Sequence, residues 1–402
     1  MCGIAGAIWT DARVAVTGPT LERMTDALRH RGPDEAGTYF NRAAGAPANR
    51  AFPAVAFGHR RLSIIDVEQS HQPLANEDET VWLVFNGEVY NYRELRRRLE
   101  GAGHRFRTAG DTETIVHLYE QEGIDFLQHL VGMFALALWD GRRRQLILAR
   151  DRLGQNPLVY RQEADRLLFA SELKGLLAVP GVPREIDPRS VDRYLTYQYV
   201  PHPETIFRGI HKLPPAHYGI YAEGRFSVRR YWAPEMNREV RRPFAESVER
   251  VRSVCREAVA MRMRSDVPLG AFLSGGIDSS VVVALMQEVS NAPVQTFSIG
   301  FTDKEYDESE WARRVAAHVG TEHHTYQVTP DSLEILPKLI WHFDEPFADS
   351  SAIPTFYVAR WAREQVTVAL TGDGGDELFC GYPRYGAMHL ASRLDRLPRA
   401  GG

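Results

Sequence analysis

The sequence predicts two domains: helices packed on stacked antiparallel sheets over residues 1–235, and an α/β domain with a parallel sheet over residues 236–402. With 402 residues, the chain is long enough for two hydrophobic cores. Short runs of β-branched and aromatic residues outnumber helical patterns in the first part. After a charged, proline-containing passage at 231–247, strand and helix patterns alternate.

Composition and charge narrow the class of protein. The chain is 44% hydrophobic and 25% charged, close to the average of soluble globular proteins, and its net charge of −4 offers no general attraction for nucleic acid or an anionic membrane. No apolar run approaches the ~20 residues that span a bilayer. Its three cysteines, Cys2, Cys255 and Cys380, are too far apart for a disulfide framework. We therefore expect a cytoplasmic protein with no nucleic-acid or membrane partner.

The elements of the first domain follow from local patterns. Helical periodicity is expected at 19–30, 92–101 and 112–122. The basic run RELRRRL (93–99) has Leu95 and Leu99 four residues apart, which is typical of an amphipathic helix whose charged face is solvated. The basic run at 141–145 is likewise expected to be solvated rather than a binding patch. Strands are expected at 57–66, 81–90, 133–140, 145–151, 166–172 and 217–224.

Cys2 follows the initiator methionine in MCGIAG. No basic segment or long apolar run precedes it and no glycine follows Met1 directly, which argues against a signal peptide or a lipid anchor. Position alone leaves two alternatives, a small core residue or a nucleophile.

The second domain repeats a βα pattern, which implies a parallel sheet that binds ligands at the carboxyl ends of its strands. A helix across 248–259 precedes the first strand. The expected strands are 268–273, 294–301, 323–328 and 366–372, with helices at 279–289 and 308–320 and two more before the last strand.

Two glycine-rich loops follow strands of this sheet. In FLSGGIDSS (272–280) a helix begins at about Asp278, so backbone N–H groups converge where an anion could bind; a tight turn with Asp278 as N-cap is the alternative. The loop lacks the GK[ST] ending of a P-loop. In TGDGGDE (371–377) three acidic residues among glycines suit Mg²⁺ beside a polyphosphate. Strand end 298–300 could contact an adenine, and DEPFADSSAIPT (344–355) an acceptor substrate.

Several motifs carry a family resemblance. SGGIDSS resembles the pyrophosphatase-type nucleotide loop of ATP-dependent amide-forming enzymes. MCGIAG, RHRGPD (29–34), HRRLSIID (59–66), NGEVYN (86–91) and GDTE (110–113) resemble the N-terminal-nucleophile glutamine amidotransferase domain. Together, from residue 1 to about 385, they resemble glutamine-hydrolysing asparagine synthetase. The resemblance implies an αββα glutaminase domain over 1–235 and a PP-loop ATP-pyrophosphatase domain, adenine nucleotide alpha hydrolase-like, over 236–402.

For the glutaminase domain, the resemblance implies that Cys2 is the nucleophile and that its α-amine, freed by removal of Met1, is the base. The Asn86 side chain and the Gly87 N–H would form the oxyanion hole. Arg61 would hold the α-carboxylate of glutamine, and Glu88 and Asp111 its α-ammonium; a surface ion pair and a helix cap are the alternatives for Arg61 and Asp111. The implied glutamine-binding residues are Arg61, Leu62, Ile64, Asn86, Gly87, Glu88 and Asp111.

For the second domain, the resemblance implies adenylation of a carboxylate, aspartate or another acceptor, which ammonia then attacks to give asparagine, glutamate, AMP and pyrophosphate. Asp278 and Asp376 would hold Mg²⁺. Asp373 stands where some members carry a longer glutamate involved in forming the acyl-adenylate. The implied ATP-binding residues are Leu273, Ser274, Gly275, Gly276, Asp278, Ser279, Ile299, Thr371 and Gly372.

Family members continue beyond the point where this sequence ends in RLDRLPRAGG. We therefore expect this chain to hydrolyse glutamine but to make asparagine poorly or not at all. Two alternatives stay open: an amidotransferase with a different carboxylate acceptor, and a non-catalytic remnant that binds glutamine. The resemblance also suggests an internal passage for ammonia and a homodimer.

Overall fold

The computed structural model describes residues 1–42, 48–236, 240–301, 307–328 and 332–394. The chain forms two compact units, the first made of Met1–Val240 with Leu333–Ser350 and the second of Arg241–Ser332 with Ser351–Gly402. This division differs from the expected linear boundary at residues 235 and 236, because Leu333–Ser350, from the second half of the sequence, packs with the first unit.

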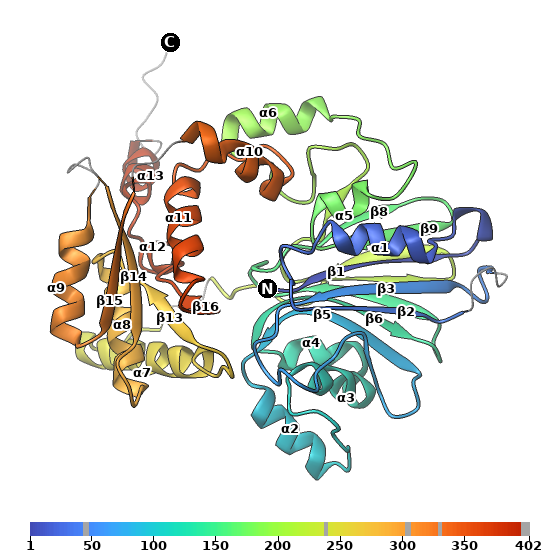
Figure 1. The fold of residues 1–402 in the computed structure, drawn as a ribbon, viewed down its shortest axis with the longest axis horizontal. Helices are drawn as coiled ribbons and strands as arrows, with labels where there is room; N and C mark the ends of the chain where they lie inside the picture. Colours follow the sequence, from blue (N-terminus) through green and yellow to red (C-terminus); the bar gives the residue numbers. More distant parts are fainter. Residues whose placement is uncertain (43–47, 237–239, 302–306, 329–331, 395–402) are drawn as a thin grey trace. The chain divides into compact units, whose positions relative to one another are not determined.

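The first unit contains two six-stranded antiparallel sheets (Figure 1). The strand order is β10-β8-β9-β1-β3-β2 in the first sheet and β12-β11-β7-β6-β5-β4 in the second. The strands are β1 (Gly3–Trp9), β2 (Glu35–Phe40), β3 (Ala54–Arg61), β4 (Leu74–Ala75), β5 (Val81–Val89), β6 (Gly132–Asp140), β7 (Gln145–Arg150), β8 (Val159–Gln162), β9 (Arg166–Ala170), β10 (His211–Lys212), β11 (His217–Ala222) and β12 (Arg225–Arg230).

Helices cover the outer faces of both sheets, so the unit has four layers, αββα (Figure 1). In β1, Ile4 and Ile8 face the second sheet, whereas Ala5 and Ala7 pack toward the helices of the outer layer, as the twofold alternation of a strand requires. The first sheet is covered by α1 (Gly18–Asp26) and α5 (Leu173–Leu177), and the second by α2 (Tyr92–Gly101), α3 (Thr112–Glu122) and α4 (Phe126–His129). The αββα expectation is confirmed. The remaining helices are η1 (Ala12–Val14), η2 (Gly123–Asp125), α6 (Pro188–Tyr197) and α10 (Ser332–Phe343).

Most elements expected in the first domain are present, with one informative difference. The expected strand at 57–66 is wrong in its second half, because β3 ends at Arg61 and the following residues form a loop. The helix predicted at 92–101 is α2, with Leu95 and Leu99 buried. On its outer face Arg96 and Arg98 pair with Glu100 and Glu122, as a solvated charged face would.

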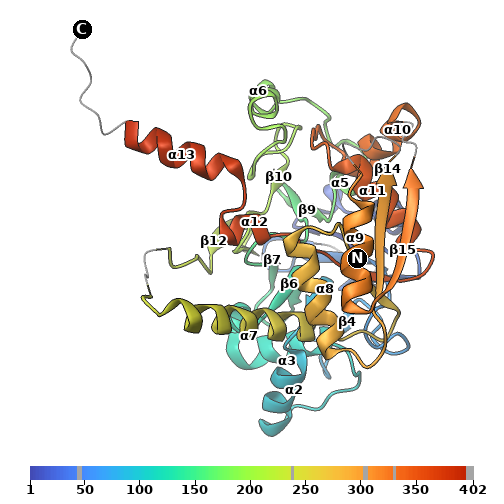
Figure 2. The same ribbon diagram turned by 90° about the vertical axis from the view of Figure 1, so that its left-hand side faces the viewer.

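The second unit is built on four parallel strands in the order β15-β14-β13-β16, which confirms the α/β expectation. Helices α7, α8 and α9 pack on one face of this sheet and α11 on the other (Figure 2). The strands are β13 (Leu269–Phe272), β14 (Gln295–Phe301), β15 (Glu322–Val328) and β16 (Val368–Leu370), and the helices α7 (Phe244–Arg262), α8 (Ile277–Val289), α9 (Ser309–Val319), α11 (Ala352–Ala362), α12 (Gly375–Phe379) and α13 (Pro383–Leu394). Among the described residues, no helix is both long and apolar enough to span a membrane.

The packing between the two sheets of the first unit yields a stability prediction. Phe57 is fully buried there and meets Phe169 edge to face with ring centroids 5.9 Å apart. We expect Phe57→Ala to lower the free energy of unfolding of the first unit by about 3–5 kcal/mol, because it removes a large buried side chain and leaves a cavity. Urea unfolding measures this. Leu195→Ala, at a side chain that is 75% exposed, is the control, and a comparable loss there would contradict the assignment.

Candidate active sites

The first candidate site lies in the first unit, where segments distant in sequence meet at one small pocket. Cys2 lies directly before β1, Arg61 ends β3, Gly87 and Glu88 belong to β5, and Asp111 precedes α3. The pocket is lined by Cys2, Arg61, Leu62, Ile64, Ile65, Ser70, Gln72, Phe85, Gly87, Glu88, Asp111 and Thr112. Its free volume of about 30 Å³ holds one or two waters, so a bound glutamine requires the lining loops to move apart.

The Cys2 thiol is held by one residue of the loop after β3. The Leu62 N–H donates to Cys2 Sγ at 3.4 Å, and the thiol faces the Leu62 carbonyl at 3.7 Å. Burial raises the pKa of the Cys2 thiol, and this outweighs the opposing effects of the positive amino terminus and of the Leu62 hydrogen bond. The thiol is therefore protonated at neutral pH, and its reaction requires a base close by.

Asn86, the predicted oxyanion donor, is fully buried in β5. Neither its amide nitrogen nor its amide oxygen finds a hydrogen-bond partner among the described residues. An unsatisfied buried amide destabilises a fold by about 1–3 kcal/mol, so its presence points to a ligand that completes it. Its neighbour Gly87 lines the pocket, and a Cβ at that position would lie 2.1 Å from the Met133 carbonyl oxygen of the adjacent strand. Only glycine fits there.

Arg61 is occupied by the protein itself. Its terminal nitrogens donate to the carbonyl oxygens of Ile65 at 3.3 Å, Asp66 at 2.6 Å and Val67 at 2.9 Å, and it pairs with Glu35 at 3.4 Å. The guanidinium is buried, which excludes the alternative of a surface ion pair. It shapes the loop that carries Leu62 and Ile64, and binding of a substrate carboxylate to Arg61 stays a prediction.

Asp111 lies at the N-cap position of α3, yet its carboxylate turns away from the helix backbone to accept the Val89 N–H at 2.8 Å. The Thr112 hydroxyl lies 3.4 Å from its other oxygen. Desolvation raises the pKa of Asp111 to about 6, although these hydrogen bonds oppose the shift. A nearby substrate cation would stabilise the charged form of this buried carboxylate.

Beneath Cys2 lies an ion-pair network that the sequence did not reveal. Arg31 Nε donates to the Cys2 carbonyl at 2.8 Å, and its terminal nitrogen pairs with Glu172 at 2.7 Å. Glu172 also pairs with Lys174, which reaches Asp344 at 3.1 Å. Arg31 is part of the RHRGPD motif, but its partner Glu172 is 141 residues away and no local pattern marks it.

The charges in this network are balanced. His30 adds a third contact to Glu172, at 3.0 Å. Burial alone would raise the pKa of Glu172, but the His30 hydrogen bond and the charges of Arg31 and Lys174 hold it well below its usual range. Asp344 pairs with Lys174 and Glu345 pairs with Lys212, so both carboxylates have their partners in the first unit. They do not line the second-unit pocket where the sequence placed an acceptor.

The second candidate site is a pocket of about 660 Å³ at the carboxyl ends of β13, β14 and β16, within the size range of ligand pockets. It brings together most of the predicted nucleotide site: Leu273, Ser274, Asp278, Ser279, Ile299, Thr371, Gly372, Asp373 and Asp376. Gly275 and Gly276 belong to the same loop without lining the pocket, and Gly300 does not line it either. Ser351, Pro354 and Thr355 lie in its wall, so this part of the 344–355 stretch is where the sequence placed it.

The glycines of both loops allow close approach of the backbone. Gly275 has φ +86°, and a Cβ there would lie 2.6 Å from the Ala312 nitrogen. Side chains at Gly372 and Gly375 would collide with Asp278, the nearest carboxylate atoms being 2.3 Å from a Cβ at Gly375. The two loops therefore touch at Asp278 and leave its carboxylate in the pocket with that of Asp376. Two carboxylates that line one pocket supply oxygen ligands of the kind that suit Mg²⁺ beside phosphates.

An αββα sandwich with a half-buried cysteine before its central strand, followed by a parallel-sheet unit with two glycine- and aspartate-rich loops, is the arrangement of an amidotransferase domain joined to a synthetase domain. Residues 1–232 match the glutamine amidotransferase domain family and residues 250–401 match asparagine synthase. The putative asparagine synthetase [glutamine-hydrolyzing] 2 of Methanocaldococcus jannaschii is 35% identical over 99% of this chain and 79% of its own length. The chain belongs to the glutamine-hydrolysing asparagine synthetase family.

Other relatives agree in name. Asparagine synthetase [glutamine-hydrolyzing] 1 of Bacillus subtilis is 38% identical over 99% of this chain and 61% of its own length. The putative asparagine synthetase of Mycobacterium tuberculosis is 39% identical over 99% of this chain and 63% of its length. This chain therefore spans about three fifths of these two relatives. Among solved structures, a glutamine phosphoribosylpyrophosphate amidotransferase from B. subtilis is 18% identical and aligns over 83% of this chain and 70% of its own, with a TM-score of 0.41.

The environment of Asp111 predicts a pH dependence. We expect Asp111 to pair with the α-ammonium of glutamine, which only its carboxylate form can do, so kcat/KM for glutamine hydrolysis is expected to fall as the pH drops through about 6. Asp111→Asn should lower kcat/KM at pH 8 by about 10-fold or more, since hydrogen bonds to charged groups contribute ~1.5–3 kcal/mol, and should remove this acid limb. Asp125→Asn, at an exposed carboxylate, is the control. An acid limb that persists unchanged in Asp111→Asn would contradict the assignment.

Proposed function

We propose that this chain carries the two sites of an enzyme that hydrolyses glutamine at Cys2 and supplies the ammonia to an ATP-activated carboxylate, that of aspartate, forming asparagine, glutamate, AMP and pyrophosphate. The expectation that this chain by itself makes little asparagine stays a prediction. The observation that carries the proposal is that one chain holds both pockets. The first is lined by the half-buried Cys2 and by Gly87, next to the unsatisfied amide of Asn86 in the sequence, and the second is lined by two glycine- and aspartate-rich loops. The names of the relatives support the same overall reaction.

In the glutaminase step, the α-amine of Cys2, exposed once Met1 is removed, takes the thiol proton. Sulfur then attacks the side-chain amide carbon of glutamine. The Asn86 amide and the Gly87 N–H stabilise the resulting oxyanion, and the ammonium group of Cys2 returns the proton to the leaving nitrogen as ammonia departs. Water hydrolyses the thioester to glutamate and restores the thiol. Arg31, by fixing the Cys2 carbonyl, holds the nucleophile in position.

In the synthetase step, ATP would bind across the ends of β13, β14 and β16. Ile299 would contact the adenine, and the Ser274–Ser279 loop would contact the phosphates. A side-chain oxygen of aspartate attacks the α-phosphorus and pyrophosphate leaves. Ammonia then attacks the acyl carbon and AMP leaves. Asp278 and Asp376 would hold Mg²⁺, which neutralises charge on the phosphates. Asp373, exposed at the same loop, faces the acceptor side.

Asn86 provides the test of the oxyanion hole. Asn86→Ala is expected to lower kcat for glutamine hydrolysis by about 10²–10³-fold, because one donor to the developing oxyanion is lost. The melting temperature should not fall, since the amide has no partner among the described residues. Asn291→Ala, at an exposed position, is the matched control. Loss of stability with little loss of kcat would assign Asn86 to the fold instead of the reaction.

Cys2 separates the two half-reactions. Cys2→Ala should abolish glutamine hydrolysis and labelling by a glutamine-like alkylating agent. It should leave aspartate-dependent exchange between ATP and pyrophosphate intact, because the second pocket contains no atom of Cys2. Cys380→Ala, which removes an exposed thiol, is the control for non-specific labelling. Glutaminase activity that survives Cys2→Ala would refute the proposed nucleophile, and exchange driven by another carboxylate but not by aspartate would refute the proposed acceptor.

A further inference from the structure

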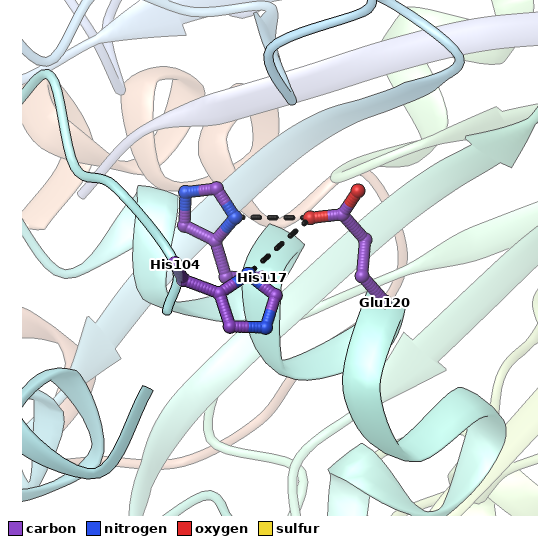
Figure 3. A group of neighbouring side chains, drawn as sticks. All are labelled: His104, His117 and Glu120. Carbon is purple, nitrogen blue, oxygen red and sulfur yellow. Dashed lines mark hydrogen bonds and ion pairs between the residues drawn. The ribbon is translucent and has the colours of Figure 1, made fainter. Parts of the chain in front are cut away.

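A second cluster of ionisable groups lies on the outer layer of the first unit, outside the glutamine pocket. His104 follows α2, and His117 and Glu120 lie one turn apart on α3; we call these three the histidine–glutamate cluster (Figure 3). One ligand atom from each lies within 4.8 Å of the others. His117 Nδ1 is 2.9 Å and His104 Nδ1 3.9 Å from Glu120 Oε2, and Figure 3 shows both rings turned toward that oxygen.

Outer contacts orient two members of the cluster. The Asn76 amide donates to Glu120 Oε1 at 2.7 Å, which leaves Oε2 directed at the two imidazoles. The other nitrogen of His117, Nε2, faces Glu113 at 3.6 Å. Glu113 is itself held by the N–H groups of Arg107 and Thr108. A histidine whose outer nitrogen faces a fixed carboxylate is the arrangement that proteins use to hold metal ligands.

The charges around His117 also favour a cation. Its side chain is fully buried, yet it faces Glu113, Glu120 and Glu77, the last at 3.9 Å from Nδ1. Three carboxylates therefore surround this one buried imidazole, and their negative charge favours a cation there. Two imidazole nitrogens and carboxylate oxygens are a donor set typical of Zn²⁺.

We propose that His104, His117 and Glu120 bind a Zn²⁺ ion, with a Glu77 oxygen or a water in the fourth position. The ion would bind Nδ1 of His117, the nitrogen that faces Glu120 Oε2. The ion would tie the 102–108 segment to α3. Since Asp111 of the glutamine pocket immediately precedes α3, about 9 Å along the helix axis from His117, the metal would brace the helix that carries this side of the pocket.

The full chain, stripped with a chelator and dialysed, is titrated with Zn²⁺ by calorimetry and with Co²⁺ by absorption spectroscopy. A Cys2→Ser background removes the thiol of the first pocket as a competing ligand. We expect one Zn²⁺ equivalent that His104→Ala weakens at least 10-fold, and the intense visible bands of four-coordinate Co²⁺. His318→Ala, at an exposed histidine of α9, is the control and should bind as the parent does.

Melting temperatures in chelator verify that His104→Ala folds, and Glu120→Gln serves as the second variant if it does not. Equal Zn²⁺ affinity in the parent chain and in the folded variant would overturn the proposal, as would a Co²⁺ spectrum of six-coordinate type. In either case the cluster would be only an ion-paired histidine among carboxylates, and the bound metal would lie elsewhere.

Discussion

The guanidinium of Arg31 bridges the carbonyl of Cys2 and the carboxylate of Glu172, and the arrangement of the first unit depends on this bridge. It fixes the residue before the central strand β1, so the thiol stays at the mouth of the pocket instead of fraying as chain ends do. Glu172 in turn gathers His30 and Lys174, and Lys174 binds Asp344. A buried carboxylate is stable only when its charge is matched. The same balance that holds Cys2 therefore also attaches the segment Leu333–Ser350 to the first unit.

Some buried polar groups of the first unit have all their partners and others do not. The terminal nitrogens of the buried Arg61 donate to loop carbonyl oxygens and pair with Glu35. The amide of Asn86, also buried, has no hydrogen-bond partner among the described residues. Asp111 retains its charge at neutral pH despite a raised pKa. Burial of the Asn86 amide and of the Asp111 carboxylate lowers the stability of the fold. Stability alone would favour apolar residues at these positions, or further hydrogen-bond partners for both groups. Asp111 lines the same pocket as Cys2, and Asn86 precedes Gly87 of that pocket, which supports the proposal that a bound substrate supplies the missing interactions.

The proposed role of the second unit requires a pocket in which negatively charged phosphates can lie close to carboxylates. Glycines at 372 and 375 let two loops from adjacent strands touch, since a side chain at either position would collide with Asp278, and the missing side chain at Gly275 lets its loop pack against the backbone of α9. Parallel pairing of β13 with both β14 and β16 places the three strand ends at one edge of the sheet. The pocket is therefore a consequence of sheet topology together with three missing Cβ atoms, and the aspartates can face it without a dedicated scaffold.

By itself, the sequence determined that antiparallel sheets with helices precede a parallel α/β unit, most of the strands and helices, and most of the residues that line the second pocket, because periodicity and short motifs are local properties of the chain. It did not predict α6, α13 or the pocket residues Ser70 and Gln72. It placed the end of β3 too late, at residue 66 instead of Arg61, since the apolar residues after Arg61 line a pocket and do not continue the strand. Only the tertiary structure decided that Glu172 and Asp344 complete the support of Cys2, that the Asn86 amide is left open, and that His104 meets His117 and Glu120. Most of these contacts join residues that lie far apart along the chain. The open amide of Asn86 depends on which neighbouring atoms the fold brings close to it. No local sequence pattern contains this information.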